Sequence, residues 1–257
     1  MSSALRAEWT KLVTQRTTVW MLLGSLGAIV GLSAAAGATA HESTFVHGGD
    51  ATRLSLVGFY LGQIVIATIA VSAISEEHAS GMLRTTLSAM PRRHAVLAAK
   101  AANVSLLAAI VGLAGVAGCL LIGRLMFPGD GLDPLHGYAL VSLGSGSTLR
   151  AALGSVLCLV LIAVLALGLG TLIRDTAVSI AAVVGLLFLP PILAQIVGGT
   201  LAREIQRLAP MTAGMAVQHT TNLRALPIQP WPGLGILAGW SLAAMLLAGV
   251  ALQARDV

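Results

Sequence analysis

The stretch AALGSVLCLVLIAVLALGLGTLI, residues 151–173, contains no Asp, Glu, Lys, Arg or His. A helix rises about 1.5 Å per residue, so this stretch is long enough to cross the roughly 30 Å hydrocarbon core of a bilayer. Five other stretches have the same property: 18–40, 54–75, 101–123, 176–200 and 231–254. The sequence therefore predicts an all-α polytopic membrane protein whose six transmembrane helices form one domain over residues 1–257.

The composition agrees with a membrane protein, since 56% of the 257 residues are hydrophobic and 10% are charged. The chain has 15 Lys plus Arg against 10 Asp plus Glu, but these basic residues lie at the ends of the apolar runs. They form no basic face, which argues against a nucleic-acid partner. Cys119 and Cys158 lie inside apolar stretches and indicate no disulfide framework.

The absence of ionisable residues from the six stretches bears on the class of transporter. Proton- and ion-coupled carriers keep such groups at mid-membrane, so this class is disfavoured. Carriers that use only backbone carbonyls and hydroxyls stay open. The polar residues Gln63, Asn103 and Gln195 are interpreted as hydrogen-bonding partners between helices. The pairs Gly27 with Gly31 and Gly235 with Gly239 would allow close helix approach.

The N-terminal region resembles a secretory signal, because a basic segment and an apolar run precede Ala38-Thr39-Ala40. The run exceeds 20 residues, whereas signal sequences have about 7–15, so we expect it to stay as the first span. Residues 1–17 are predicted to form an amphipathic helix in the headgroup layer. Its interfacial residues are Trp9, Lys11 and Arg16.

The distribution of Lys and Arg predicts the orientation. With the N-terminus inside, the cytoplasmic segments hold nine of them: Arg6, Lys11, Arg16, Arg84, Arg92, Arg93, Lys100, Arg174 and Arg255. The outer segments hold six: Arg53, Arg124, Arg150, Arg203, Arg207 and Arg224. We therefore expect both termini to be cytoplasmic, in a bacterial plasma membrane.

The loop over residues 76–93 then lies in the cytoplasm. Its apolar residues recur at helical spacing: Met82, Leu83, Thr86, Leu87 and Met90. Pro91 ends this short amphipathic helix, and Arg92 and Arg93 lie at the anionic inner leaflet, where Lys100 can snorkel. Two interpretations stay open, a basic anchor that fixes the topology and a helix that docks a partner protein.

Residues 201–230 form a long outer segment with apolar and charged residues on different helical faces, so we expect it to lie partly in the interface. Pro190 and Pro191 in the fifth span predict a bend, which is either a hinge or a static distortion. The glycine- and serine-rich residues 144–147 are interpreted as a loop. No pattern of catalytic or metal-ligating residues is found.

The two lysines exclude a phosphate-binding loop of the Walker A type in this chain. Such a loop ends in Gly-Lys-Ser or Gly-Lys-Thr, but Lys11 follows Thr10 and Lys100 follows Ala99. If ATP drives this protein, the ATPase is another polypeptide.

Several segments together resemble one family. They are Glu8-Trp9-Thr10-Lys11, the run from Glu77 to Leu87 with Pro91-Arg92-Arg93, Arg174-Asp175-Thr176-Ala177, Leu208-Ala209-Pro210 and Arg255-Asp256. In this order they resemble the membrane subunits of type-2 ATP-binding-cassette (ABC) exporters, especially small actinobacterial ones. The resemblance implies a permease half of six spans that pairs with a second copy or a related chain and sits on two copies of an ATPase, which binds ATP and Mg²⁺.

The resemblance also implies roles for parts of the chain. Residues 76–93 correspond to the coupling helix that contacts the ATPase, through Glu77, His78, Gly81, Met82, Leu83, Arg84, Thr85, Leu87, Pro91, Arg92 and Arg93. Residues 201–230 correspond to external re-entrant helices. The expected function is export of a hydrophobic or amphipathic substrate such as a drug, antibiotic, peptide or lipid, without catalysis or a bound cofactor in this chain. An ATP-independent channel or carrier and a membrane anchor or assembly protein are the alternatives.

Overall fold

A computed structural model of the chain describes residues 9–10, 14–39, 50–79, 93–126 and 145–254. These residues contain helices and connecting turns and no strands, which confirms the predicted all-α class. The helices are α2 (Arg16–Ala38), α4 (Ala51–Ser55), α5 (Phe59–Ala79), α7 (Arg93–Met126), α8 (Gly146–Ile173), α9 (Thr176–Val197), α10 (Gly199–Leu208), α11 (Pro210–Met215), the 3-10 turns η3 (Ala216–Gln218) and η4 (Leu223–Ala225), and α12 (Pro230–Ala254).

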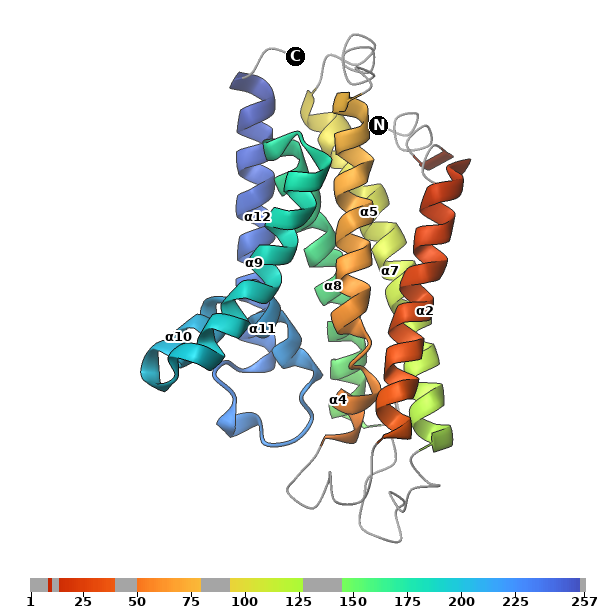
Figure 1. Cartoon of the computed structure of the whole chain (residues 1–257), viewed down its shortest axis with the longest axis vertical. Coiled ribbons are helices and arrows are strands. Elements are labelled where there is room, and N and C mark those ends of the chain that lie inside the picture. Colours follow the sequence, from red (N-terminus) through yellow and green to blue (C-terminus); the bar gives the residue numbers. More distant parts are fainter. Residues whose placement is uncertain (1–8, 11–13, 40–49, 80–92, 127–144, 255–257) are drawn as a thin grey trace, which may run out of the picture.

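The long helices form an antiparallel bundle around α8 (Figure 1). α8 packs against α5, α7 and α12, and its buried residues include Leu159, Ile162 and Leu167. The beginning of α2 and the end of α12 lie at the same end of the bundle, whereas α4, α10 and α11 lie towards the other end. This arrangement agrees with two chain termini on one side of a membrane.

Among the described residues, five helices are long and apolar enough to cross a membrane: α2, α7, α8, α9 and α12. The predicted second span corresponds to α5, whose apolar part, Phe59–Ser75, is shorter. The sixth expected span, at α5, therefore stays a prediction. The chain is a multi-pass membrane protein.

The predicted continuous helix over 54–75 is wrong, because a turn over residues 56–58 separates α4 from α5. Gly58 lies at this turn against α2: a Cβ atom added to it would lie 1.8 Å from the carbonyl oxygen of Ile29. The backbone N–H of Gly58 also donates a 3.0 Å hydrogen bond to Ser33 Oγ. Close contact with α2 thus requires a residue without a side chain at the start of α5.

Two other segments differ from the sequence-based expectation. Residues 146 and 147 belong to α8 and not to a loop, and Ser145 Oγ caps this helix by accepting a hydrogen bond of 3.3 Å from Thr148 N–H. The fifth span was expected to reach residue 200 but ends at Val197, because Gly198 has a φ of +66°. Gly199 then begins α10 with the same φ, so the chain changes direction there.

The expected polar and glycine contacts were partly wrong. Gln63 is fully buried, but its side-chain amide has no hydrogen-bond partner among the described residues. A Cβ atom added at Gly27, Gly31, Gly235 or Gly239 would meet no described atom within 4 Å. These four glycines therefore bring no helices together within the described part of the chain.

Replacement of Gly58 by alanine tests the contact between α2 and α5. Gly58→Ala should destabilise the protein by about 1–3 kcal/mol, because the new methyl group must displace the backbone of α2. Gly27→Ala is the matched control, since a methyl group there meets open space and alanine favours a helix. Thermal unfolding in detergent measures both variants. Equal melting temperatures for Gly58→Ala and the wild type would contradict the contact.

Candidate functional site

A carboxylate joins two distant parts of the chain at the end of the bundle that carries α4. Asp50 Oδ1 accepts a hydrogen bond of 3.0 Å from Arg53 N–H and so caps α4. The same carboxylate accepts bonds from the backbone N–H and hydroxyl of Thr220 and from Thr221 N–H, the last at 3.2 Å. The segment that precedes α12 is thereby fixed to the N-terminus of α4. We call Asp50, Thr220 and Thr221 the outer latch, where "outer" denotes the end of the bundle that carries α4.

α8 strengthens this connection. Arg150 donates a 2.7 Å hydrogen bond from its guanidinium group to the carbonyl oxygen of His219. Thr148 lies 3.4 Å from Thr52 of α4, oxygen to oxygen, and both side chains are buried. The central helix, α4 and the segment before α12 therefore meet at one place.

α10 and α11 are held against α12. A Cβ atom added at Gly233 would lie 2.1 Å from the carbonyl oxygen of Ala213, so glycine is required for this approach of α12 to α11. Trp240 Nε1 donates a hydrogen bond of 3.0 Å to the carbonyl oxygen of Leu208, at the C-terminus of α10. Ala213 and Met215 are buried, so α11 belongs to the core and is more than a surface loop.

A cavity of about 530 Å³ lies between α4, α5, α9, α10, α11 and the segment before α12. Its volume is in the roughly 300–1,000 Å³ range of small-molecule sites. We call it the outer cavity. Its lining residues are Arg53, Tyr60, Phe188, Pro191, Ile192, Gln195, Gln206, Met211, Thr212, Met215, Ala216, His219, Leu226, Pro227 and Ile228.

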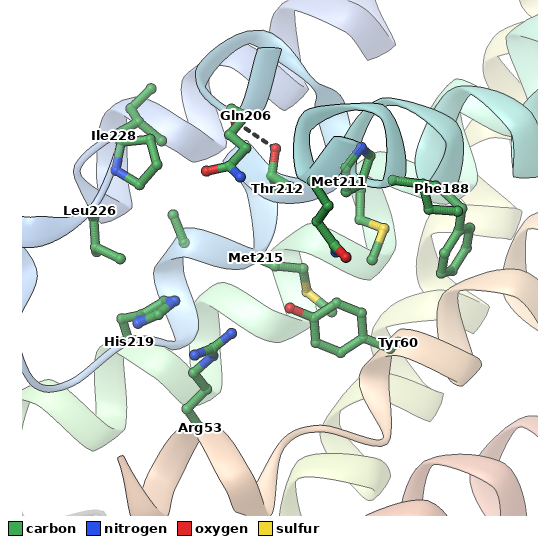
Figure 2. A pocket seen from close by; sticks show the side chains of 15 residues that line it. Arg53, Tyr60, Phe188, Gln206, Met211, Thr212, Met215, His219, Leu226 and Ile228 are labelled. Carbon is green, nitrogen blue, oxygen red and sulfur yellow. Dashed lines mark hydrogen bonds between the residues drawn. The ribbon is translucent and has the colours of Figure 1, made fainter. Parts of the chain in front are cut away.

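The outer cavity is apolar over most of its wall and basic on one side. Figure 2 shows Arg53 and His219 near one another, with Tyr60 and Met215 further in and Phe188 beyond them. Burial and the charge of Arg53 hold the pKa of His219 below its usual value, although Asp50 acts in the opposite direction. The surroundings of His219 thus favour its neutral imidazole, and Arg53 supplies a positive charge on this side of the cavity.

The opposite end of the bundle contains the boundaries of the predicted coupling helix. α5 ends at Ala79 and α7 begins at Arg93, both at the end where α2 begins (Figure 1). Lys100 of α7 is buried and donates a hydrogen bond of 2.9 Å to the carbonyl oxygen of Ala73 in α5. The expectation that its amine snorkels to the surface is therefore wrong. Instead, Lys100 joins the two helices that flank residues 80–92.

The predicted coupling residues are described only in part. Glu77 and His78 lie in the last turn of α5, and Arg93 is the first residue of α7. The others lie outside the described residues: Gly81, Met82, Leu83, Arg84, Thr85, Leu87, Pro91 and Arg92. Their role stays a prediction.

The remaining predicted residues lie in helical segments or outside the described residues. Trp9 is helical, Lys11 lies outside the described residues, and Arg16 is the first residue of α2. Pro190 and Pro191 lie inside α9, which continues to Val197, and Pro191 lines the outer cavity. The predicted bend at these prolines stays a prediction.

Sequence reasoning missed the outer latch and the outer cavity. Asp50 and Thr220 are 170 positions apart, and their contact has no periodicity or motif that could reveal it. Gln195 had been interpreted as a contact between helices, but its side chain is exposed and lines the cavity. The sequence feature that could have indicated the cavity was Arg53, a basic residue directly before the apolar stretch 54–75.

Comparison with known proteins places this architecture in a class of membrane transport proteins. The profile of the ABC-2 family transporter proteins matches residues 4–181, and the chain belongs to this family. Among proteins of curated function, none matches the chain. The chain is therefore a permease component of an ABC transporter, and membership of this family implies an ATPase partner. The matched residues end within α9, before α10, α11 and α12.

Replacement of Asp50 tests the outer latch. Asp50→Asn removes the negative charge that accepts bonds from Thr220 and Thr221, so we expect a loss of about 1–3 kcal/mol in stability. Hydrogen exchange at both threonine amides should accelerate. Asp175→Asn is the control, because Asp175 caps α9 by accepting a bond from Val178 N–H at 2.8 Å and lies away from the latch. Faster exchange at Thr220 in both variants alike would contradict a specific latch.

The lowered pKa of His219 predicts a pH dependence of stability. The folded protein resists protonation of this imidazole more than the unfolded chain does, so His219 favours folding above about pH 6.5. This contribution decreases as the pH falls below that value. His219→Gln should therefore reduce the loss of melting temperature between pH 7.5 and pH 5.5. If the melting temperature depends on pH in the same way in both proteins, the assignment of this pH dependence to His219 is refuted.

Proposed function

We propose that this chain is the permease half of an ABC exporter, which forms the translocation pathway for a hydrophobic or amphipathic substrate. A second copy or a related chain completes the pathway, and two copies of a separate ATPase bind at the cytoplasmic side. Membership of the ABC-2 family supports the general class. The observation that carries the proposal further is that residues 80–92 connect α5 to α7 in the sequence and that a hydrogen bond from Lys100 to the carbonyl oxygen of Ala73 joins these two helices.

This connection gives a route for mechanical coupling. Lys100 holds α7 to α5 through the carbonyl oxygen of Ala73, so a force on the intervening residues acts on both helices together. α5 and α7 both pack against α8, the central helix. We infer that closure of the ATPase dimer moves this group of helices and that ATP and Mg²⁺ bind only to the partner.

α9 is a suitable moving wall of the pathway. Only four of its residues are buried within the described part of the chain: Ser179, Val183, Leu187 and Ala194. Pro190 and Pro191 remove backbone donors from its second half, which weakens the helix next to the outer cavity. We infer that these prolines form a hinge and that α10 and α11, as external re-entrant helices, close the pathway.

The proposed orientation has both termini in the cytoplasm of a bacterial cell. It is supported by the excess of Lys and Arg on that side and by the common position of the first turn of α2 and the last turn of α12. In this orientation the 1–17 helix lies on the inner leaflet, and the outer latch and outer cavity face the exterior.

Replacement of Arg84 tests the ATPase contact. Arg84→Glu should reduce the affinity for an ABC ATPase from the same organism by about tenfold or more, because it reverses a charge in the proposed interface. Co-purification and substrate-stimulated ATP hydrolysis measure the effect. Arg203→Glu is the control, since Arg203 is an exposed residue of α10 at the other end of the bundle. Unchanged binding and hydrolysis in Arg84→Glu would remove residues 76–93 as the coupling element.

Labelling of a cysteine introduced at Ser88 tests the orientation. Both native cysteines are buried, which keeps the background low. A membrane-impermeant maleimide should fail to label Ser88→Cys in intact cells and should label it after permeabilisation. Labelling in intact cells would place this loop outside and would contradict the proposal.

A further inference from the structure

We propose that the outer cavity binds an amphipathic anion, with its acidic head group at Arg53 and its apolar body between α5, α9 and α11. The binding site follows from the cavity itself. That its ligand is the transported substrate rests on the function proposed above, and the inference then narrows the substrate to molecules that combine a negative charge with an apolar chain or ring.

The first step is the charge at the wall. Arg53 lines the cavity, and its guanidinium group makes no ion pair with a carboxylate among the described residues. The described lining also contains no Asp or Glu. An arginine that faces an apolar space without an acidic partner favours a ligand that brings its own carboxylate, phosphate or sulfonate.

The second step concerns Asp50, which precedes Arg53 by three residues and accepts a hydrogen bond from its backbone N–H. It does not line the cavity, and its two oxygens accept hydrogen bonds from Arg53 N–H and from donors of Thr220 and Thr221. The carboxylate is thereby directed towards the latch. It fixes the segment that carries His219 without supplying an acceptor to the cavity.

The third step is the composition of the rest of the wall. Phe188 and Ile192 of α9, Met211 and Met215 of α11, and Leu226 supply apolar surface. Methionine side chains are flexible and polarizable, so they adapt to apolar groups of different shapes. The hydroxyl of Tyr60 is directed towards Met215 in Figure 2 and offers a neutral donor within the cavity.

These features disfavour other ligand classes. A metal ion would need anionic ligands, which the described lining lacks, and an organic cation would be repelled by the guanidinium group of Arg53. A wholly apolar molecule would leave the guanidinium group of Arg53 without a counter-charge. A small inorganic anion would leave most of the roughly 530 Å³ unfilled. An amphipathic anion satisfies both parts of the wall.

Binding of radiolabelled palmitate to the purified full chain in phosphatidylcholine nanodiscs tests the inference, with hexadecanol as the neutral analogue. The wild type should bind palmitate saturably and at least about tenfold more tightly than hexadecanol, because one charge-assisted hydrogen bond is removed in the alcohol. Arg53→Gln should lose this preference, and Arg53→Lys should keep most of it. Arg203→Gln should bind palmitate as the wild type does.

Equal affinity for palmitate and hexadecanol, or unchanged palmitate binding in Arg53→Gln, would overturn the inference. Arg53→Gln keeps the backbone N–H that Asp50 accepts, and size-exclusion chromatography confirms that the variant is folded. Nanodiscs that contain phosphatidylglycerol separate two sources of the same chemistry. If phosphatidylglycerol competes with palmitate for the wild type, a membrane lipid is a ligand of the site. If it does not compete, the ligand is a single-chain amphiphile. Both outcomes support an anion site.

Failure of this inference can be distinguished from failure of the proposed function. The nanodisc assay uses the chain without an ATPase, so its result is independent of coupling. Conversely, Arg53→Gln should bind the ATPase as the wild type does, because Arg53 belongs to α4, which lies at the opposite end of the bundle from the last turn of α5 and the first turn of α7. Loss of ATPase binding in Arg53→Gln would show a general defect and would also count against the assignment of Arg53 to the ligand.

Discussion

The packing of α8 against α5, α7 and α12 is the contact on which the rest of the structure depends. Lipid supplies no hydrophobic force between apolar helices, so helices in a membrane associate through close packing and hydrogen bonds. α8 meets this requirement with small buried residues along its length, including Ala152, Ala163 and Gly168. Ser241 of α12 adds a hydrogen bond of 2.8 Å to the carbonyl oxygen of Leu161 in α8. α2 and α9 bury less of their surface within the described part of the chain than α7 and α8 do.

The two ends of the bundle are joined by different chemistry. At the end where α2 begins, a buried amine, Lys100 Nζ, connects α7 to α5. At the outer end, the carboxylate of Asp50 and the guanidinium group of Arg150 hold the segment before α12 by their bonds to backbone groups. Charged side chains thus hold backbone segments at both ends of the bundle. A displacement of α7 or of the segment before α12 would therefore be transmitted to α8 through these contacts.

The sequence predicted the apolar helices because their pattern is local. Length and absence of charge located α2, α7, α8, α9 and α12 to within a few residues at most ends. It could not predict the break at Gly58, since the cause is the carbonyl oxygen of Ile29 in another helix. It also missed Lys100, because a lysine at the end of an apolar run has the same pattern whether its amine reaches water or a carbonyl group. The outer cavity was out of reach for the same reason, since its walls come from residues between 53 and 228.

The composition of the cavity wall has an evolutionary consequence. Residues that match the family profile supply Arg53 and Tyr60, whereas the wall from Phe188 to Ile228 lies after residue 181, beyond the matched part. α5 and α7 lie wholly within the matched part. If the outer cavity binds the substrate as proposed, selection could therefore alter one side of it by substitution over one short stretch of the chain while α5 and α7 stay unaltered.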